Sequence, residues 1–149
     1  EPMLEFLKQQ ALRNPRQRCR LCLHSTPEDA LHEMIIVHTK DVFVPPHVHS
    51  AKAESFSIIS GKATLYLLNS SGQPTEAISL GEPGSGRALC AKIPAGQWHT
   101  QRFESDVAVF YEVTSGPFTP QGTATLWDAN SPDHEIMAAA FLKKLHAFR

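Results

Sequence analysis

Residues 54–68 of the chain read ESFSIISGKATLYLL. In the first half of this stretch, Glu54, Phe56 and Ile58 alternate with serines. An extended strand would therefore place these three side chains on one face. Polar and apolar residues alternate again over 62–68. Alternation with a period of two is typical of half-buried β-strands, so this stretch predicts two consecutive strands.

Short apolar runs of the same kind recur along most of the chain, separated by Pro and Gly. The strand candidates are 18–24, 33–39, 42–45, 54–60, 62–68, 75–80, 88–93, 98–103, 107–114 and 123–127. Many short strands at near-regular spacing predict an all-β sandwich or barrel.

Amphipathic segments flank the strand-rich region. The first is expected to be a helix that ends before Asn14. For the last, Ser131 is the expected N-cap and Pro132 the first helical residue. The expected organisation is a single domain over 1–149, with an N-terminal helix at 1–14, a β-barrel at 18–127 and a C-terminal helix at 131–148.

The composition excludes several classes of protein. A net charge of −1 gives no overall field that would draw the chain onto nucleic acid or anionic lipid. No apolar stretch approaches the ~20 residues of a membrane-spanning helix. The first residues lack the basic-then-apolar order of a secretion signal. We therefore expect a cytoplasmic protein with no nucleic-acid or membrane partner.

Arginines form one local basic cluster near the start, at Arg13, Arg16, Arg18 and Arg20. Such a run is most often a solvated face. A role in anion binding or in a subunit contact is the alternative, and the sequence leaves both open.

Four residues have the pattern of a metal site. His47 and His49 lie two residues apart, so on a strand both imidazoles project from one face. Glu54 follows five residues later and can return from a turn to the same point. His99 follows a Pro-x-Gly turn and can approach from another strand. Three nitrogens and one carboxylate oxygen suit a divalent first-row ion and leave positions open for water or substrate.

Two motifs resemble those of the cupin family. They are H-x-H-x4-E-x6-G from His47 to Gly61 and P-x-G-x2-H from Pro94 to His99. The resemblance implies the cupin jelly roll, a double-stranded β-helix barrel, with His47, His49, Glu54 and His99 as metal ligands. Three positions depart from the usual motifs, namely Asp41, Ala88 and Phe103.

Residues from about 16 to 130 resemble more closely the small WbuC-type cupin metalloproteins. The matching features include the arginines that lead into the segment ending at His24, and the Lys-x-Glu triplet that ends at Glu54. Two usual residues are replaced, by Ala53 and by Cys22, which indicates an altered pocket. The resemblance implies a bacterial cupin metalloprotein but no particular reaction.

Candidate pocket residues follow from strand parity and from this resemblance. They are His24, Lys52, Phe56, Ile58, Trp98 and Gln101. His24 would lie near the barrel mouth and Lys52 at the rim, whereas Trp98 fits a pocket wall and simple core packing equally well. Arg87 and Arg102 are candidates for holding a carboxylate or phosphate. No catalytic residue is assigned.

Three functions are compatible with this pattern. The first is a metal-dependent enzyme, an oxygenase or an isomerase, acting on a small polar or anionic metabolite. The second is a non-catalytic module that binds a metal or a metabolite. The third is a metal-independent sugar-nucleotide epimerase that uses His and Tyr. The ligand set permits Fe, Mn, Ni, Co or Zn, and apolar stripes on both terminal segments predict a homodimer.

Overall fold

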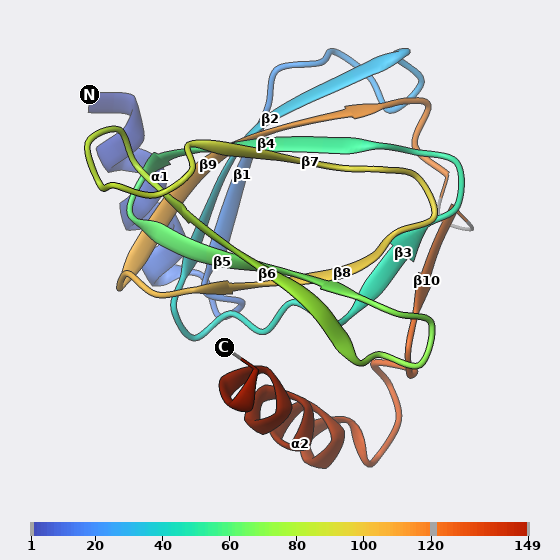
Figure 1. The fold of residues 1–149 in the computed structure, drawn as a ribbon. Coiled ribbons are helices and arrows are strands. Elements are labelled where there is room, and N and C mark those ends of the chain that lie inside the picture. Colours follow the sequence, from blue (N-terminus) through green and yellow to red (C-terminus); the bar gives the residue numbers. More distant parts are fainter. Residues whose placement is uncertain (1, 120–121, 149) are drawn as a thin grey trace.

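The computed structural model describes residues 2–119 and 122–148. Within these residues the chain forms two five-stranded sheets that face each other and a helix near each end (Figure 1). The elements are α1 Pro2–Arg13, β1 Arg18–Cys22, β2 Leu31–Thr39, β3 His47–His49, β4 Glu54–Ser60, β5 Lys62–Leu68, β6 Pro74–Gly81, β7 Cys90–Ile93, β8 Trp98–Phe103, β9 Val107–Ser115, β10 Thr123–Thr125 and α2 His134–Ala147.

The strand order confirms the predicted all-β jelly roll. One sheet runs β1-β2-β9-β4-β7 and the other runs β10-β3-β8-β5-β6. Neighbouring strands within each sheet pair in antiparallel fashion. Consecutive strands repeatedly cross from one sheet to the other, so residues distant in sequence meet between the sheets.

The inner faces of the two sheets enclose the main core. As the alternation predicts, Phe56 and Ile58 point inward and are 2% and 1% exposed. Leu65 of the second predicted strand is fully buried opposite them. Phe103 and Phe110 stack in the same core, with ring centroids 5.5 Å apart. Burial of these apolar side chains is the main stabilising contribution to the fold.

Each helix covers the outer face of one sheet (Figure 1). Leu7 and Ala11 of α1 pack against Val37 and Val109 of the first sheet. The C-terminal helix α2 packs its Phe141 against the second sheet. The helices therefore shield the outer faces of the sheets and leave the space between the sheets to the core and the cavities.

One predicted strand is absent, and one predicted helix begins later than expected. The candidate strand 42–45 is not a strand, and the paired segment begins at His47 instead. Pro45 and Pro46 explain this difference, because proline has no N–H for a sheet hydrogen bond. The second helix begins at His134, not at Pro132. In the structure Ser131 Oγ accepts a hydrogen bond from the Asp133 N–H in a turn that precedes the helix.

Among the residues described, neither helix combines the length and the apolar composition needed to cross a lipid bilayer.

Candidate metal centre

Strands from both sheets bring the four predicted metal ligands together. On β3, Val48 separates His47 from His49, so both imidazoles lie on the same face. The antiparallel pairing of β3 with β8 sets His47 directly opposite His99. Glu54 is the first residue of β4 and reaches the same point from the facing sheet.

A hydrogen bond joins the two sequence motifs. The N–H of Gly96 donates to the carbonyl of His49 over 2.8 Å. Gly96 has a φ of +79°, in the left-handed region that favours glycine. The turn before β8 therefore fixes the position of His99 relative to β3.

The potential ligand atoms of the four residues all lie within 4.8 Å of one another. The two carboxylate oxygens of Glu54 are each 3.1 Å from an imidazole Nε2, one of His49 and the other of His99. The ring centroids of His47 and His99 are 4.1 Å apart. His99 is only 1% exposed, so its ring is shielded from water.

Backbone carbonyls fix the orientation of two of the rings. His47 Nδ1 lies 2.8 Å from the carbonyl oxygen of Pro45, and His99 Nδ1 lies 2.9 Å from that of Gln97. A carbonyl oxygen can only accept, so each Nδ1 carries the hydrogen and donates. In the neutral ring, Nε2 then presents a lone pair to the cluster. This arrangement is typical of metal-binding histidines.

This donor set fits a cation. His99 Nε2 is buried and has no hydrogen-bond partner among the described residues. The 3.1 Å approach of Glu54 does not satisfy it, because neither a carboxylate oxygen nor a lone pair brings a hydrogen. Electron-rich atoms facing one another at such distances need a proton or a metal cation between them. A divalent ion would meet that need.

The pKa values favour the metal-binding protonation states. Burial, with a contribution from the neighbouring His99, lowers the pKa of His47 to about 4, so this ring is neutral at pH 7. Burial alone would raise the pKa of Glu54, but its contacts with His49 and His99 outweigh burial and hold that pKa below its ordinary value. Glu54 is therefore a carboxylate at pH 7.

A cavity of about 260 Å³ is lined by three of the four ligands, His47, His49 and Glu54. Two of the predicted pocket residues, Lys52 and Gln101, line it. The Oε1 atom of Gln101 is buried without a hydrogen-bond partner among the described residues. The ammonium of Lys52 lies 5.6 Å from the ring centroid of Phe118, another lining residue.

The other predicted pocket residues lie elsewhere. Phe56 and Ile58 point inward but belong to the apolar core beyond the cavity. Trp98 packs in the cluster between the second sheet and α2. The ring of His24 stacks on His32 at 4.0 Å, and its Nδ1 meets the backbone of Glu33.

The two arginines that were candidates for holding a carboxylate or phosphate, Arg87 and Arg102, contact other residues of the chain. Arg87 forms two hydrogen bonds to Glu104, at 2.8 and 2.9 Å. Arg102 contacts His146 of α2. Neither of these two arginines lines the metal cavity.

Sequence reasoning missed several lining residues, among them Arg18, Arg20, His38 and Glu112. The sequence predicted the arginines as a basic cluster, with anion binding as one alternative, but not that they face the metal cavity. Glu112 interrupts the apolar run at 107–114, and its parity with Phe110 was the available signal that it points inward.

Glu112 is the second carboxyl group of the cavity. Burial, followed by the charge of Glu54, raises its pKa to about 7. His49 and Arg20 partly oppose this shift. The site therefore holds one firmly ionised carboxylate and one carboxyl group that can exchange a proton near pH 7.

Similar solved structures identify the fold as that of the cupins. The cupin domain of Cnp3 from Schizosaccharomyces pombe matches at a TM-score of 0.53 and 13% identity, covering 66% of this chain and 64% of that chain. KdgF from Halomonas sp. matches at 0.55 and 15%, covering 73% of this chain and 87% of that chain. These likenesses show the cupin fold, and the His and Glu cluster within it has the features of a metal-binding site.

The first 80 residues match the family model described as "Domain of unknown function (DUF6016)", and the chain belongs to this family. The match runs from α1 to the last residues of β6 and includes three of the four ligands, but not His99. Among curated proteins, none matches the sequence. Oxalate decarboxylase from Bacillus subtilis matches in structure at a TM-score of 0.57 and 21% identity over 89% of this chain, which spans only 34% of that chain.

Proposed function

We propose that this chain is a cupin metalloprotein that holds one divalent transition-metal ion through His47, His49, Glu54 and His99. We propose further that it acts on a small polar or anionic metabolite in the adjoining cavity. The observation that carries the proposal is the buried Nε2 atom of His99, which lacks a hydrogen-bond partner among the described residues. Its Nδ1 is committed to a backbone carbonyl, so a metal ion is the partner that fits.

The ion would be Fe, Mn, Ni, Co or Zn, which all accept nitrogen and oxygen donors. When bound, it would supply Lewis-acid chemistry or, as Fe(II), oxygen chemistry at its open positions. The resemblance to WbuC-type cupins stays a prediction and adds no reaction.

The cavity residues would handle the substrate. Gln101 Oε1 can accept a hydrogen bond from a hydroxyl or amide group of the substrate, since it has no partner among the described residues. A carboxyl oxygen of Glu112 can take up or release a proton near pH 7. Lys52 at the cavity wall would attract an anionic group.

The carboxyl group of Glu112, which can exchange a proton near pH 7, favours an enzyme. A passive binding module would not need such a group. The third function, a metal-independent epimerase, needs a tyrosine in the cavity. Tyr66 instead packs toward α2, and Tyr111 donates to Glu33. Neither tyrosine lines the metal cavity, so an oxygenase or isomerase that depends on metal is the function we propose.

Elemental analysis of the protein purified without a histidine tag tests the metal site. We expect one ion per chain in the wild type and almost none in a variant with His47→Ala and His49→Ala. His146→Ala, on the exposed face of α2, is the matched control and should keep the ion. Equal metal content in all three proteins would rule out this ligand set.

A second experiment separates oxygenase from isomerase chemistry. The protein is loaded with Fe(II) without oxygen, candidate metabolites are added, and air is then admitted. Oxygen uptake that depends on a metabolite supports the oxygenase version. Conversion of a metabolite under nitrogen supports the isomerase version, and neither signal with any metabolite would favour the binding module.

We also propose that the chain forms a homodimer in the cytoplasm, as expected from the sequence. Phe6 of α1 and Ile136 of α2 are 60% and 71% exposed, and large apolar side chains at the surface often mark a contact between subunits. Light scattering checks the oligomeric state, and a particle of 16.5 kDa would reject the dimer.

A further inference from the structure

The arginine cluster of the sequence borders a second cavity. Arg18 and Arg20 lie two residues apart on the edge strand β1, so their side chains share a face. Register pairs Arg18 with His38 and Arg20 with Ile36, both of which face into the barrel. Together with Arg16, these side chains line a cavity of about 550 Å³, a volume suited to a small metabolite.

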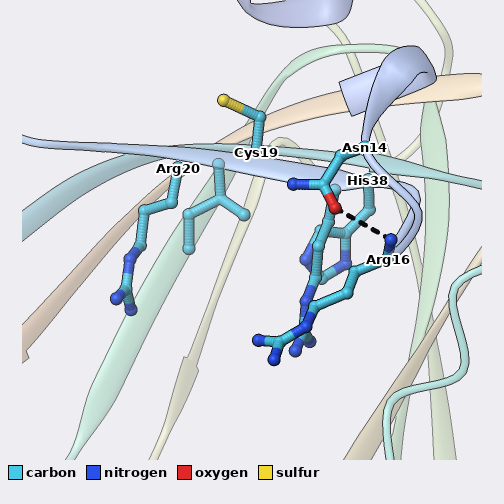
Figure 2. A pocket seen from close by; sticks show the side chains of 7 residues that line it. Asn14, Arg16, Cys19, Arg20 and His38 are labelled. Atoms are coloured by element: carbon cyan, nitrogen blue, oxygen red, sulfur yellow. Dashed lines mark hydrogen bonds between the residues drawn. The ribbon is translucent and has the colours of Figure 1, made fainter. Parts of the chain in front are cut away.

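The labelled arginine side chains of this cavity extend to one side of the strand, whereas Cys19 points to the other side (Figure 2). Figure 2 shows Arg16 and Arg20 reaching past the ribbon toward the same open space, with His38 behind Arg16. Asn14 Oδ1 accepts a hydrogen bond from the N–H of Arg16 at 2.8 Å, which holds the turn between α1 and β1. The guanidinium groups are thus presented by an ordered segment.

Within the part of the chain that the structure describes, these arginines form no salt bridge, although the charge of Arg20 is felt by Glu112. Among the described residues, no ion pair within 4.0 Å involves Arg16, Arg18 or Arg20. Arg87, by contrast, is held by both carboxylate oxygens of Glu104. Three like charges around one cavity repel one another, and a bound anion would relieve that repulsion.

The second cavity adjoins the metal cavity. Arg18, Arg20 and His38 line both of them. A guanidinium nitrogen of Arg20 also lies 3.8 Å from the sulfur of Met34, which is part of the metal cavity wall. One molecule can therefore contact the arginines and the metal-site residues at once.

We propose that Arg16, Arg18 and Arg20 bind the phosphate group of a small phosphorylated metabolite whose other end reaches the metal centre. This inference rests on the proposed function and names its substrate class. A phosphate monoester carries close to two negative charges and three acceptor oxygens, which can engage several guanidinium groups. A carboxylate has a single charge, which one bidentate arginine satisfies.

Calorimetric titration of the metal-free protein with inorganic phosphate, at constant ionic strength, tests the anion site alone. We expect saturable binding that weakens at least about tenfold in the Arg18→Gln, Arg20→Gln double variant, since each lost bond to a charged group is substantial. Arg13→Gln is the matched control, because Arg13 belongs to the same basic run but lines neither of the two cavities.

Three results would overturn the proposal. They are no binding by the wild type, an equal loss in Arg13→Gln, and tighter binding of malonate than of phosphate. Failure of the anion site can be told apart from failure of the metal site. The double arginine variant should lose phosphate binding but keep its full metal content. Likewise, the variant lacking His47 and His49 should still bind phosphate.

Phosphorus-31 relaxation of phosphate bound to the Mn(II)-loaded protein tests the link between the cavities. We expect faster relaxation than in the Zn(II)-loaded protein, since the phosphate would lie near the paramagnetic ion. This enhancement should disappear in the double arginine variant. If it persists there, phosphate binds the ion directly and the arginine site is rejected. If the wild type shows none, the two cavities do not share a ligand.

Discussion

The inner surface of the barrel is polar at one end and apolar at the other, although the same three strands build both. At the polar end, β4 contributes Glu54, β8 contributes His99 and Gln101, and β9 contributes Glu112. These residues face the metal cavity or surround it. Each is followed or preceded on its own strand by apolar residues at alternate positions.

At the apolar end, the same strands contribute Ile58, Phe103 and Phe110, which are between 1% and 2% exposed. Because alternate residues of a strand share a face, one strand can supply a ligand and a core residue a few residues apart. This contrast between the two ends indicates that the apolar core stabilises the barrel. The ligands at the polar end can then be altered at little cost to folding. The predictions below test this division of roles.

The largest effect is expected from Phe110→Ala at the apolar end. Phe110 is 1% exposed, and such a truncation removes buried contacts and leaves a cavity, at about 3–5 kcal/mol. Urea unfolding of the metal-free protein measures the loss. Phe6→Ala, at a side chain that is 60% exposed, should change stability by less than about 0.5 kcal/mol. A more than tenfold loss of metal affinity in the folded Phe110→Ala protein would show that the two ends are not independent.

His38, a titratable residue between the metal cavity and the apolar end, should give the next largest effect. His38 lies edge-on to Phe103 and Phe110, and burial, aided by the charge of Arg18, lowers its pKa to about 4. The unfolded chain takes up a proton near pH 6.5, whereas the folded chain resists it until about pH 4. The stability is thus full above pH 6.5 and is lost as the pH falls toward 4, by about 3 kcal/mol.

Comparison with His38→Leu isolates this contribution. Between pH 7 and pH 4 the metal-free wild type should lose about 3 kcal/mol more than the variant, as measured by urea unfolding at each pH. Parallel curves for the two proteins would mean that His38 is protonated in the folded state or is not buried.

The polar end was largely predictable from sequence, because its ligands are encoded locally. Spacing places His47 and His49 on one face, and the turn before His99 marks the start of its strand. The same parity shows why Trp98 lies outside: it is adjacent to His99, so their side chains point to opposite faces.

Other features depend on pairing that spacing does not encode. The cavity position of Arg18 follows from its register with His38, set by contacts twenty residues apart in sequence. Because β1 carries polar residues on one face and only moderately buried ones on the other, its pattern alone does not identify the inner face. The prediction that Phe56 and Ile58 point inward is confirmed. Both lie further along β4 than Glu54, so they belong to the core and do not line the cavity.

A smaller effect is expected from Glu112→Gln at the polar end. The raised pKa of about 7 means that the folded metal-free protein holds a proton that the unfolded chain releases near pH 4.5. The associated stability is full below pH 4.5 and is lost as the pH rises through 7, which is the opposite sign to His38. Allowing for solvent screening, we expect the wild type to lose about 2 kcal/mol relative to the variant between pH 4.5 and pH 8.

Unfolding curves at pH 4.5 and pH 8 check this prediction, with Glu76→Gln as the control for a change in overall charge. Glu76 is an exposed residue of β6. If Glu112→Gln and Glu76→Gln respond alike to pH, the carboxyl group of Glu112 is solvated and cannot serve as the proton-exchanging group of the cavity.

The smallest expected effect concerns a residue that supports a ligand without belonging to the cluster. Thr123 Oγ1 lies 2.8 Å from His49 Nδ1 and can accept its hydrogen, leaving Nε2 free for a metal ion. Thr123→Val removes this hydroxyl at constant shape and should weaken metal binding about tenfold, as loss of such partners commonly does. Competition titration with a chromophoric chelator measures the affinity. Thr125→Val, two residues along the same strand, removes a hydroxyl that donates to Trp127 instead and should leave the affinity unchanged. Equal affinities in the two variants would mean that the ring of His49 is oriented by packing in the polar end and not by its hydrogen bond.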